Sequence, residues 1–440
     1  MPSPPPNLRI VIFNFLKLYS RYKNTNDLGE MMKKALLTLA LSTCLAACGG
    51  SDKSAKNDDQ IKIGILTDSP VAGATYIVNG NNDNAKKTNA NGEFEYQDGD
   101  VITFKIGDIE IGTVQGLARV TPNELVDEDL NADERNKRII NLLIFLQSLD
   151  IDEDKETIQI PDDVSNLSPT SIDFSNATSD FRERLQAQII NIPEIASNTV
   201  VSEDQAKEHF NGSMLKDIQG VWYAKNDESE IVLFIGENGE YMLGEPIPNE
   251  PYSSSNGMEY AKINLDALSG SLYASSINST TPVIDTNEDW GLLDHGESRS
   301  MKLSFDGSVL KISEAENPDE SAEFTRVPRN NSGIVGAWQS SSGKQIFVFN
   351  SNNTFIMVDA IGDDQPDPYD GPCGGPGIEY GHYQLRDNKL FVTTPLSIDT
   401  NGCAGLSDTD AHLGLPLQIS TQSLSFTVAD EGTFTLTRMN

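Results

Sequence analysis

The sequence predicts a mainly β, multi-domain protein with a helical middle, in which an N-terminal β-sandwich precedes tandem antiparallel β-barrel or β-sandwich repeats. Three observations predict this fold class. Apolar and polar residues alternate over 61–120, apolar residues recur at helical spacing over 131–149, and six short motifs of the C-terminal half occur twice in the same order. A period of two is typical of half-buried antiparallel strands, whereas spacings of three and four residues place apolar side chains on one helix face.

Residues 61–125 make up the predicted sandwich. Phe94 and Tyr96 alternate with polar neighbours, so their rings fall on one face of a strand. The dipeptides Asn79-Gly80 and Asn91-Gly92 predict tight turns between strands, because Asn and Gly tolerate positive φ angles.

Residues 126–215 form the predicted helical region. It contains one apolar stripe at helical spacing, and further helices are expected over 174–190 and 202–210. Ser202 is a suitable N-cap, because its hydroxyl can accept a hydrogen bond from a free amide of the first turn. The stripe consists of Ile139, Ile140, Leu142, Leu143, Leu146 and Leu149.

The C-terminal half repeats itself. Two β repeats are predicted, over 216–329 and 332–440, because six motif pairs keep their order with offsets between 112 and 120 residues. Chance similarity would not hold this spacing across a whole unit. The paired motifs begin at Gly220 and Gly336, Asn238 and Asn352, Gly257 and Gly377, Ile284 and Ile398, Gly291 and Gly405, and Phe324 and Leu436.

Each repeat opens on Gly-x-Trp, with Trp222 or Trp338, and closes on a strand that carries Arg326 or Arg438. This pairing resembles the calycin, or lipocalin-like, barrel. The resemblance implies that the last-strand arginine stacks on the first-strand tryptophan, a cation–π contact at the closed end of the barrel. Small β-sandwiches also begin on a buried tryptophan, so both architectures remain open.

A secretory signal peptide is predicted over residues 31–47. A pair of lysines precedes a short apolar stretch and two alanines, which is the pattern of an exported protein. The apolar stretch is shorter than the roughly 20 residues of a transmembrane helix. We interpret residues 1–30 as translation assigned from a start codon upstream of Met31 or Met32, with a genuine extended leader as the alternative.

The end of this signal, Leu45-Ala46-Ala47-Cys48, resembles the lipobox of bacterial lipoproteins. The resemblance implies that Cys48 becomes the N-terminus and carries fatty acyl chains such as palmitate, each buried methylene contributing about 0.8 kcal/mol to membrane anchoring. By resemblance to enterobacterial sorting, Gly49 implies the outer membrane, on its periplasmic or its surface face. Residues 48–60 are expected to form a flexible tether. An uncleaved apolar helix with a chance cysteine is the alternative.

The cysteines fit an oxidising compartment. Cys44 leaves with the signal and Cys48 takes the lipid, so Cys373 and Cys403 remain as an even pair. A disulfide between them is the expected state in the cell envelope. Two free thiols or a metal pair are the alternatives.

The chain is strongly acidic, with 66 acidic and 32 basic residues. Residues 1–47 hold two of the acidic and six of the basic residues, so the mature part carries 64 against 26, a net charge near −38. Such a charge repels nucleic acid and excludes nucleic-acid binding, which needs a basic face. It also fits a salty habitat, where ions screen acidic surfaces.

The front module has a resemblance of its own. Residues 68–74 and 88–94 look like the carboxypeptidase-regulatory-like (transthyretin-type) β-sandwich module, and the continuation to about residue 165 is similar to the front half of gammaproteobacterial surface lipoproteins. This resemblance implies a non-catalytic accessory or display module.

No catalytic residue is predicted. None of the four histidines stands at a metal-ligand spacing, and neither a Gly-x-Ser-x-Gly elbow nor a glycine-rich phosphate loop occurs. The repeated motif Ile-Asp-Thr-Asn suits a turn at the end of a strand, and we prefer this interpretation to a catalytic role for Asp285 and Asp399.

Asp150, Asp152 and Asp154 are candidate calcium ligands, because carboxylates at alternate positions match the first ligands of a calcium loop. An EF-hand is excluded, since Lys155 and Pro161 occupy the positions of its glycine and glutamate. A solvated helix end is the alternative.

These features favour a non-enzymatic lipoprotein that displays two related β domains for binding. Its candidate ligands are a small apolar molecule inside a barrel, a glycan or an envelope protein. The alternatives are an envelope hydrolase that uses carboxylates not identifiable from sequence, and an assembly or structural protein.

Overall fold

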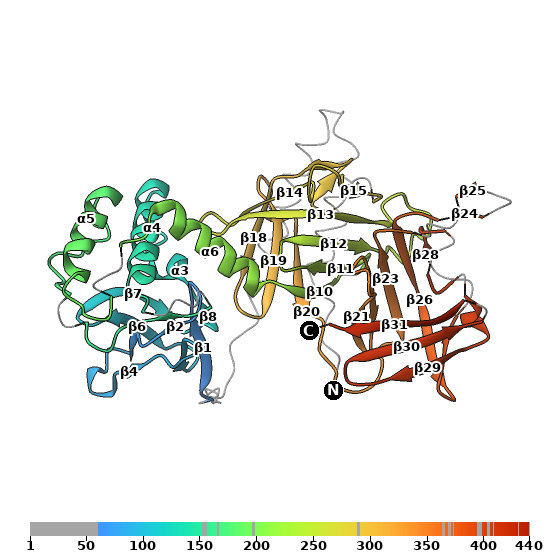
Figure 1. Cartoon of the computed structure of the whole chain (residues 1–440), viewed down its shortest axis with the longest axis horizontal. Helices are drawn as coiled ribbons and strands as arrows, with labels where there is room; N and C mark the ends of the chain where they lie inside the picture. Colours follow the sequence, from blue (N-terminus) through green and yellow to red (C-terminus); the bar gives the residue numbers. More distant parts are fainter. Residues whose placement is uncertain are drawn as a thin grey trace, which may run out of the picture. The chain divides into compact units, whose positions relative to one another are not determined.

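The computed structural model describes residues 60–440 apart from 152–155, 165–166, 196–198, 288–290, 363–365, 368–370, 373, 394–397, 403–404, 408, 430 and 440. The predicted fold class is confirmed: the chain is mainly β, with helices in its middle and two closed antiparallel barrels of eight strands each (Figure 1). The predictions for the signal peptide, Cys48, the Cys373–Cys403 disulfide, Asp152 and Asp154 lie outside the described residues.

The front module is a sandwich of two sheets, ordered β5-β1-β8 and β4-β3-β6-β7, beside the short parallel pair β2-β9. Phe94 of β5 meets Phe104 of β6 edge to face, with ring centroids 5.0 Å apart, so the two sheets share an apolar core. The strands are β1 (Lys62–Leu66), β2 (Val71–Ala72), β3 (Thr75–Val78), β4 (Lys86–Lys87), β5 (Glu93–Tyr96), β6 (Val101–Ile106), β7 (Ile109–Gln115), β8 (Arg119–Val120) and β9 (Ile158–Gln159).

The helical middle packs its apolar stripe into the same core. The Ser202 hydroxyl accepts a hydrogen bond from the backbone amide of Gln205, and the Gln205 side-chain oxygen accepts one from the backbone amide of Ser202. This capping box begins the last of these helices. The helices are α3 (Pro122–Leu125), α4 (Ala132–Ser148), α5 (Thr178–Ile189) and α6 (Glu203–Asp217).

The first barrel closes where β12 pairs with β13. Around it the strand order is β10-β11-β12-β13-β14-β18-β19-β20, and β20 pairs back onto β10. Its strands are β10 (Gly220–Lys225), β11 (Glu230–Ile235), β12 (Glu240–Glu245), β13 (Gly257–Asp266), β14 (Ser271–Ser275), β18 (Met301–Phe305), β19 (Val309–Glu314) and β20 (Ser321–Arg326). Three short strands accompany it: β15 (Ile284–Asp285), β16 (Leu293–Asp294) and β17 (Glu297–Ser298).

The second barrel repeats this topology strand for strand. Its order is β21-β22-β23-β26-β27-β29-β30-β31, closed by β23 on β26 and by β31 on β21. Its strands are β21 (Gly336–Gln339), β22 (Gln345–Phe349), β23 (Thr354–Asp359), β26 (Gly377–Arg386), β27 (Lys389–Val392), β29 (Leu415–Ile419), β30 (Ser423–Val428) and β31 (Gly432–Arg438). The short strand β28 (Ile398–Asp399) pairs with β26 as β15 pairs with β13.

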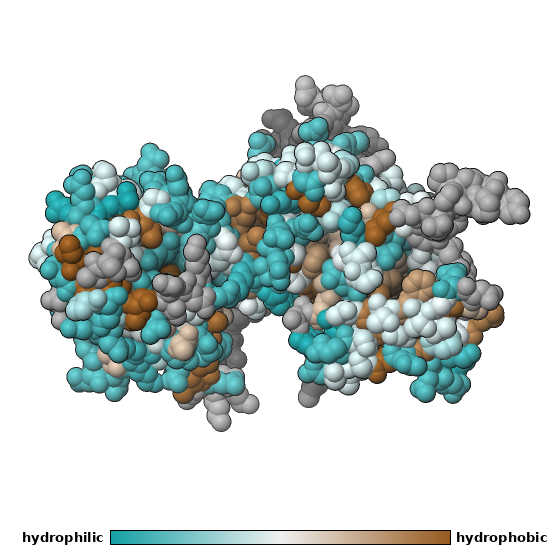
Figure 2. Space-filling view, in the orientation of Figure 1, coloured by the Kyte–Doolittle hydropathy of each residue, from teal (hydrophilic) through white to brown (hydrophobic). Residues whose placement is uncertain are grey.

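An apolar cluster contains residues from the outer faces of both barrels, including Val221, Met258, Val348 and Ile378. The strands approach so closely there that a Cβ on Gly244 would lie 2.4 Å from a methyl of Val358. Hydrophilic residues dominate the face drawn in Figure 2, in keeping with the excess of acidic residues.

Candidate functional site

The four residues that mark the repeats form two equivalent stacks. The guanidinium carbon of Arg326 lies 4.2 Å from the ring centroid of Trp222, and that of Arg438 lies 3.9 Å from Trp338. In each barrel the two residues are direct cross-strand partners on the first and last strands. Both indoles are fully buried and donate to a backbone carbonyl. These residues therefore hold the first and last strands of each barrel together, which is a structural role.

A second repeated feature is a buried glutamate near the start of a long strand. Glu259 on β13 and Glu379 on β26 are fully inaccessible to solvent. Glu259 lies opposite Asp285 of β15, and Glu379 lies opposite Asp399 of β28. Directly opposed residues of antiparallel strands project to the same face, so each barrel brings two carboxylates together.

In the first barrel, the Glu259 carboxylate binds the backbone amides of the loop that contains Leu292 and Leu293. Oε2 accepts hydrogen bonds from the Tyr241 hydroxyl at 2.8 Å and the Leu292 amide at 3.1 Å, and Oε1 accepts one from the Leu293 amide at 3.2 Å. Gly291 has a φ of 93°, and a Cβ there would lie 2.0 Å from Oε1, so a larger residue would be strained and would have to displace the carboxylate. Burial raises the pKa of Glu259 to about 8 although these donors act against the shift, and the charge of Asp285 adds to it.

The second barrel repeats the arrangement with one change. Glu379 accepts hydrogen bonds from the amides of Leu406, at 2.9 Å, and Ser407, at 3.0 Å. The Ser407 hydroxyl replaces the tyrosine: it lies 2.5 Å from Glu379 and 3.2 Å from an oxygen of Asp399. Burial raises the pKa of Glu379 to about 7 and also raises that of Asp399. The Ser407 hydroxyl has one proton and can donate it to only one of these carboxylates at a time.

The asparagine of each Ile-Asp-Thr-Asn motif completes the site. Asn287 and Asn401 have no solvent-accessible surface, and neither polar atom of either amide has a hydrogen-bond partner within the described parts of the chain. The same holds for Oδ1 of Asp285, whose other oxygen accepts from the Gly296 amide at 2.6 Å. Buried polar atoms without partners are costly, so their recurrence in both barrels marks a candidate ligand site.

Sequence reasoning identified Asp285 and Asp399 but interpreted them as turn residues, and it did not single out either glutamate. The available signal was the repeated Gly-x-Glu-Tyr motif of residues 257–260 and 377–380. That motif keeps the glutamate in both repeats, but its contact with Asp285 or Asp399 depends on strand register.

The structure assembles no cluster from the predicted calcium residues that it describes. Asp150 accepts a hydrogen bond from the Gln159 amide at 2.9 Å, at the end of α4. Within the described ranges no group of three His, Cys, Asp or Glu side chains is placed to hold a metal ion. Each barrel site combines a glutamate and an aspartate with an asparagine, whose side-chain oxygen belongs to an amide.

A buried Asp–His–Ser group lies between the turn after β1 and helix α6. His209 Nδ1 is 3.2 Å from Asp68 Oδ1, His209 Nε2 is 3.5 Å from the Ser69 hydroxyl, and Gln147 donates to Asp68 at 2.8 Å. The amide of Ser69 already donates to the Ser213 hydroxyl at 2.8 Å, so it cannot stabilise an oxyanion at Ser69. Burial raises the pKa of Asp68. The group therefore ties α6 to the sandwich.

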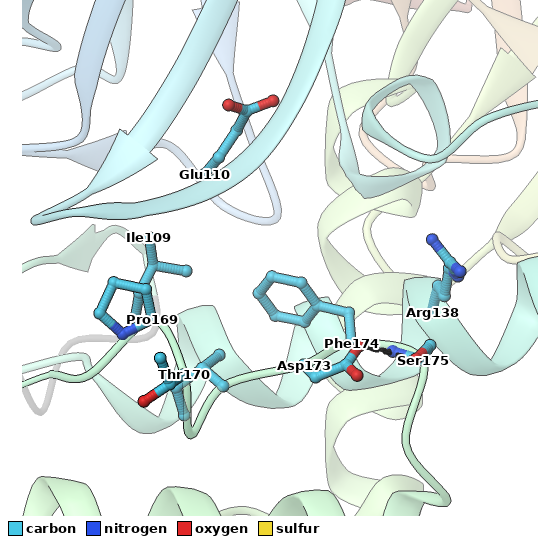
Figure 3. A pocket seen from close by; sticks show the side chains of 9 residues that line it. Ile109, Glu110, Arg138, Pro169, Thr170, Asp173, Phe174 and Ser175 are labelled. Carbon is cyan, nitrogen blue, oxygen red and sulfur yellow. Dashed lines mark hydrogen bonds between the residues drawn. The ribbon is translucent and has the colours of Figure 1, made fainter.

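Two surface hollows accompany these sites. The first, of about 410 Å³, lies between β7 and the loop 169–175; Figure 3 shows Phe174 and Thr170 on that loop, with Arg138 on the neighbouring helix α4. Its Asp173 accepts hydrogen bonds from the amide and hydroxyl of Ser175, which lower its pKa.

The second hollow, of about 440 Å³, lies on the outer face of the first barrel beside the turn between β21 and β22. Lys344 of that turn lies 5.8 Å from the ring centroid of Tyr260. Two rings and several amide, hydroxyl and carboxylate groups line it: Phe234, Tyr260, Glu237, Asn238, Glu240, Asn278, Thr281, Gln339, Ser342 and Lys344.

No protein-family model matches the chain, and comparison with curated proteins finds no significant relative. Within the described residues, no helix is both long enough and apolar enough to span a membrane.

Proposed function

We propose that this chain is a lipid-anchored cell-envelope protein, held on the outer membrane by Cys48, that binds a ligand and does not catalyse a reaction. The lipobox-like sequence and the following polar tether support the anchor. Mass spectrometry of the membrane-extracted protein tests it. We expect an acylated N-terminal Cys48 and release of Cys48→Ala from the membrane fraction. An unmodified N-terminus upstream of residue 48 would contradict the anchor.

The burial and hydrogen bonding of the two glutamates favour a binding protein over a hydrolase. A glycoside hydrolase needs two carboxylates that face each other across an open cleft. Glu259 and Glu379 are instead inaccessible and bound to loop amides, and each sits in a different barrel. The Ser69 hydroxyl lacks an available amide beside it. None of these groups is arranged for attack on a substrate from solvent.

The hollow beside Tyr260 supports a glycan as the ligand, and this is the observation on which the proposal rests. The half-buried ring of Phe234 can pack against the apolar side of a sugar, while amides and carboxylates match hydroxyls that both donate and accept hydrogen bonds. Its volume of about 440 Å³ suits a small ligand such as one or two sugar units. The barrel interiors contain large buried side chains such as Trp222, Tyr241 and Phe349, so we do not propose an apolar ligand there.

A glycan array probed with the mature lipidated chain in detergent tests this ligand class. We expect selective binding that Asn238→Ala and Gln339→Ala each weaken about tenfold, because each removes hydrogen bonds worth about 0.5–1.5 kcal/mol. Thr170→Ala in the other hollow is the matched control and keeps the affinity. Loss of binding in the control, or no glycan bound at all, contradicts the proposal. An envelope protein cross-linked at Asn238 would identify the alternative partner.

A further inference from the structure

We infer that each barrel holds one hard divalent cation with the size and chemistry of Ca²⁺, bound by the Asp and Asn oxygens of its Ile-Asp-Thr-Asn motif beside the buried glutamate. The ligands are Asp285 and Asn287 in the first barrel, and Asp399 and Asn401 in the second. This inference goes beyond the proposed function, because the proposed ligands are not among the residues that line the hollow and do not depend on a glycan.

Each site buries a glutamate opposite an aspartate: Glu259 lies opposite Asp285, and Glu379 lies opposite Asp399. Within the described residues, none of these four carboxylates forms an ion pair with a lysine, an arginine or a histidine. Two carboxylates without a basic partner in a low-dielectric site need a proton or a cation between them.

The asparagine of each site has an unpartnered amide. Asn287 and Asn401 are completely buried, and their side chains have no hydrogen-bond partner within the described parts of the chain. Oδ1 of Asp285 is likewise buried and has no such partner there. A proton on the glutamate would leave all of these oxygens unsatisfied. A cation satisfies the oxygens of aspartate and asparagine together, and it does so in both repeats.

The spacing of the two side chains also fits a cation. Oxygen side chains at alternate positions, as in Asp285-x-Asn287 and Asp399-x-Asn401, match the first two ligands of a calcium loop. The register places Asp285 opposite Glu259, and Asn287 follows two residues later, just beyond the end of β15. Gly257 allows this approach, because a Cβ there would lie 2.5 Å from the backbone of Thr286.

The donor set selects the kind of ion. The described ligands are carboxylate and amide oxygens, which suit Ca²⁺ and other hard cations, whereas softer metals prefer imidazole or thiolate. The fifth position of each motif, Asp289 or Cys403, lies outside the described residues.

Calcium titration of the mature lipidated chain, stripped with EGTA and kept in detergent, tests the inference by isothermal calorimetry. We expect two equivalents of Ca²⁺. The variant D285A/N287A should lose one equivalent, D399A/N401A should lose the other, and the combined variant should bind none. Asp294→Ala, an exposed carboxylate next to the first site, is the matched control and should keep both equivalents.

Each two-residue variant contains its own folding control, because the untouched barrel should still bind one equivalent. Calcium should also raise the midpoint of thermal unfolding of the parent chain and leave that of the combined variant unchanged. No bound calcium, or two equivalents retained by the combined variant, overturns the inference. An equivalent lost only in D150A/D152A/D154A belongs to the acidic run after α4. A negative result leaves glycan binding untouched, and a failed glycan array leaves the two equivalents in place.

Discussion

The guanidinium of Arg438 stacks on the indole of Trp338 with 3.9 Å between its central carbon and the ring centroid, across the seam that joins the last strand of the barrel to the first. The same arginine donates to the carbonyls of Gly333, at 2.8 Å, and Thr421, at 2.9 Å. Cation–π stacking and hydrogen bonds to backbone carbonyls thus act through one buried side chain.

We expect Arg438→Lys to destabilise the chain by about 1–2 kcal/mol, because lysine keeps the charge but loses the planar stack and the forked hydrogen bonds. Urea unfolding of the parent and the variant measures this difference. Arg386→Lys is the control: Arg386 stacks on Phe391 at 4.3 Å but lies on the surface, and it should cost less. Equal losses at the two positions would show that Arg438 does not hold the seam.

Stability should fall as pH rises through the folded pKa of Glu259. This pKa, about 8, lies above its ordinary unfolded value, so folding favours the protonated form. The contribution is full at low pH, declines above the unfolded pKa, and is lost once pH passes about 8. Urea unfolding between pH 5 and 9 in EGTA should show this decline, and Glu259→Gln should reduce it to the part that comes from Glu379, whose pKa is raised to about 7. A decline of the same size in Glu259→Gln would assign it to other groups.

Gly291→Ala should be more destabilising than Gly296→Ala. Both glycines have positive φ, 93° and 78°, so alanine is strained at either position by about 1 kcal/mol or more. Only at Gly291 would the new methyl also collide with Glu259, 2.0 Å from its Oε1, whereas at Gly296 the closest atom is 3.7 Å away. Thermal unfolding compares the two, and hydrogen exchange at the Leu292 amide should rise only in Gly291→Ala. Equal effects would mean that the loop does not depend on Glu259.

Gln147→Met should loosen the contact between α6 and the sandwich. The amide of Gln147 donates to Asp68 at 2.8 Å and to the Ala206 carbonyl at 3.1 Å. Removing the donor leaves a buried carboxylate short of a partner and should cost about 1–3 kcal/mol in the free energy of unfolding. Lys207→Met breaks only an exposed ion pair with Glu203 on the same helix and should stay within about 0.5 kcal/mol. An unchanged stability in Gln147→Met would remove this group from the packing of α6.

The fold class followed from local patterns. Alternation marked the strands, the apolar stripe marked α4, and Ser202 begins α6 with the capping box its hydroxyl allows. The duplication was visible because each repeat retains short motifs at constant spacing. These signals reside in neighbouring residues, so a single sequence is enough to detect them.

The choice of a barrel over a sandwich, and the existence of the paired carboxylate sites, were decided only by tertiary structure. Closure needs the last strand, β20, to pair with the first, β10, and this pairing joins residues about 100 positions apart in the sequence. Glu259 and Asp285 are 26 positions apart and become neighbours through one strand register. A shift of that register by one residue would turn Glu259 to the opposite face, so its burial, its raised pKa and its hold on the loop are properties of the closed barrel.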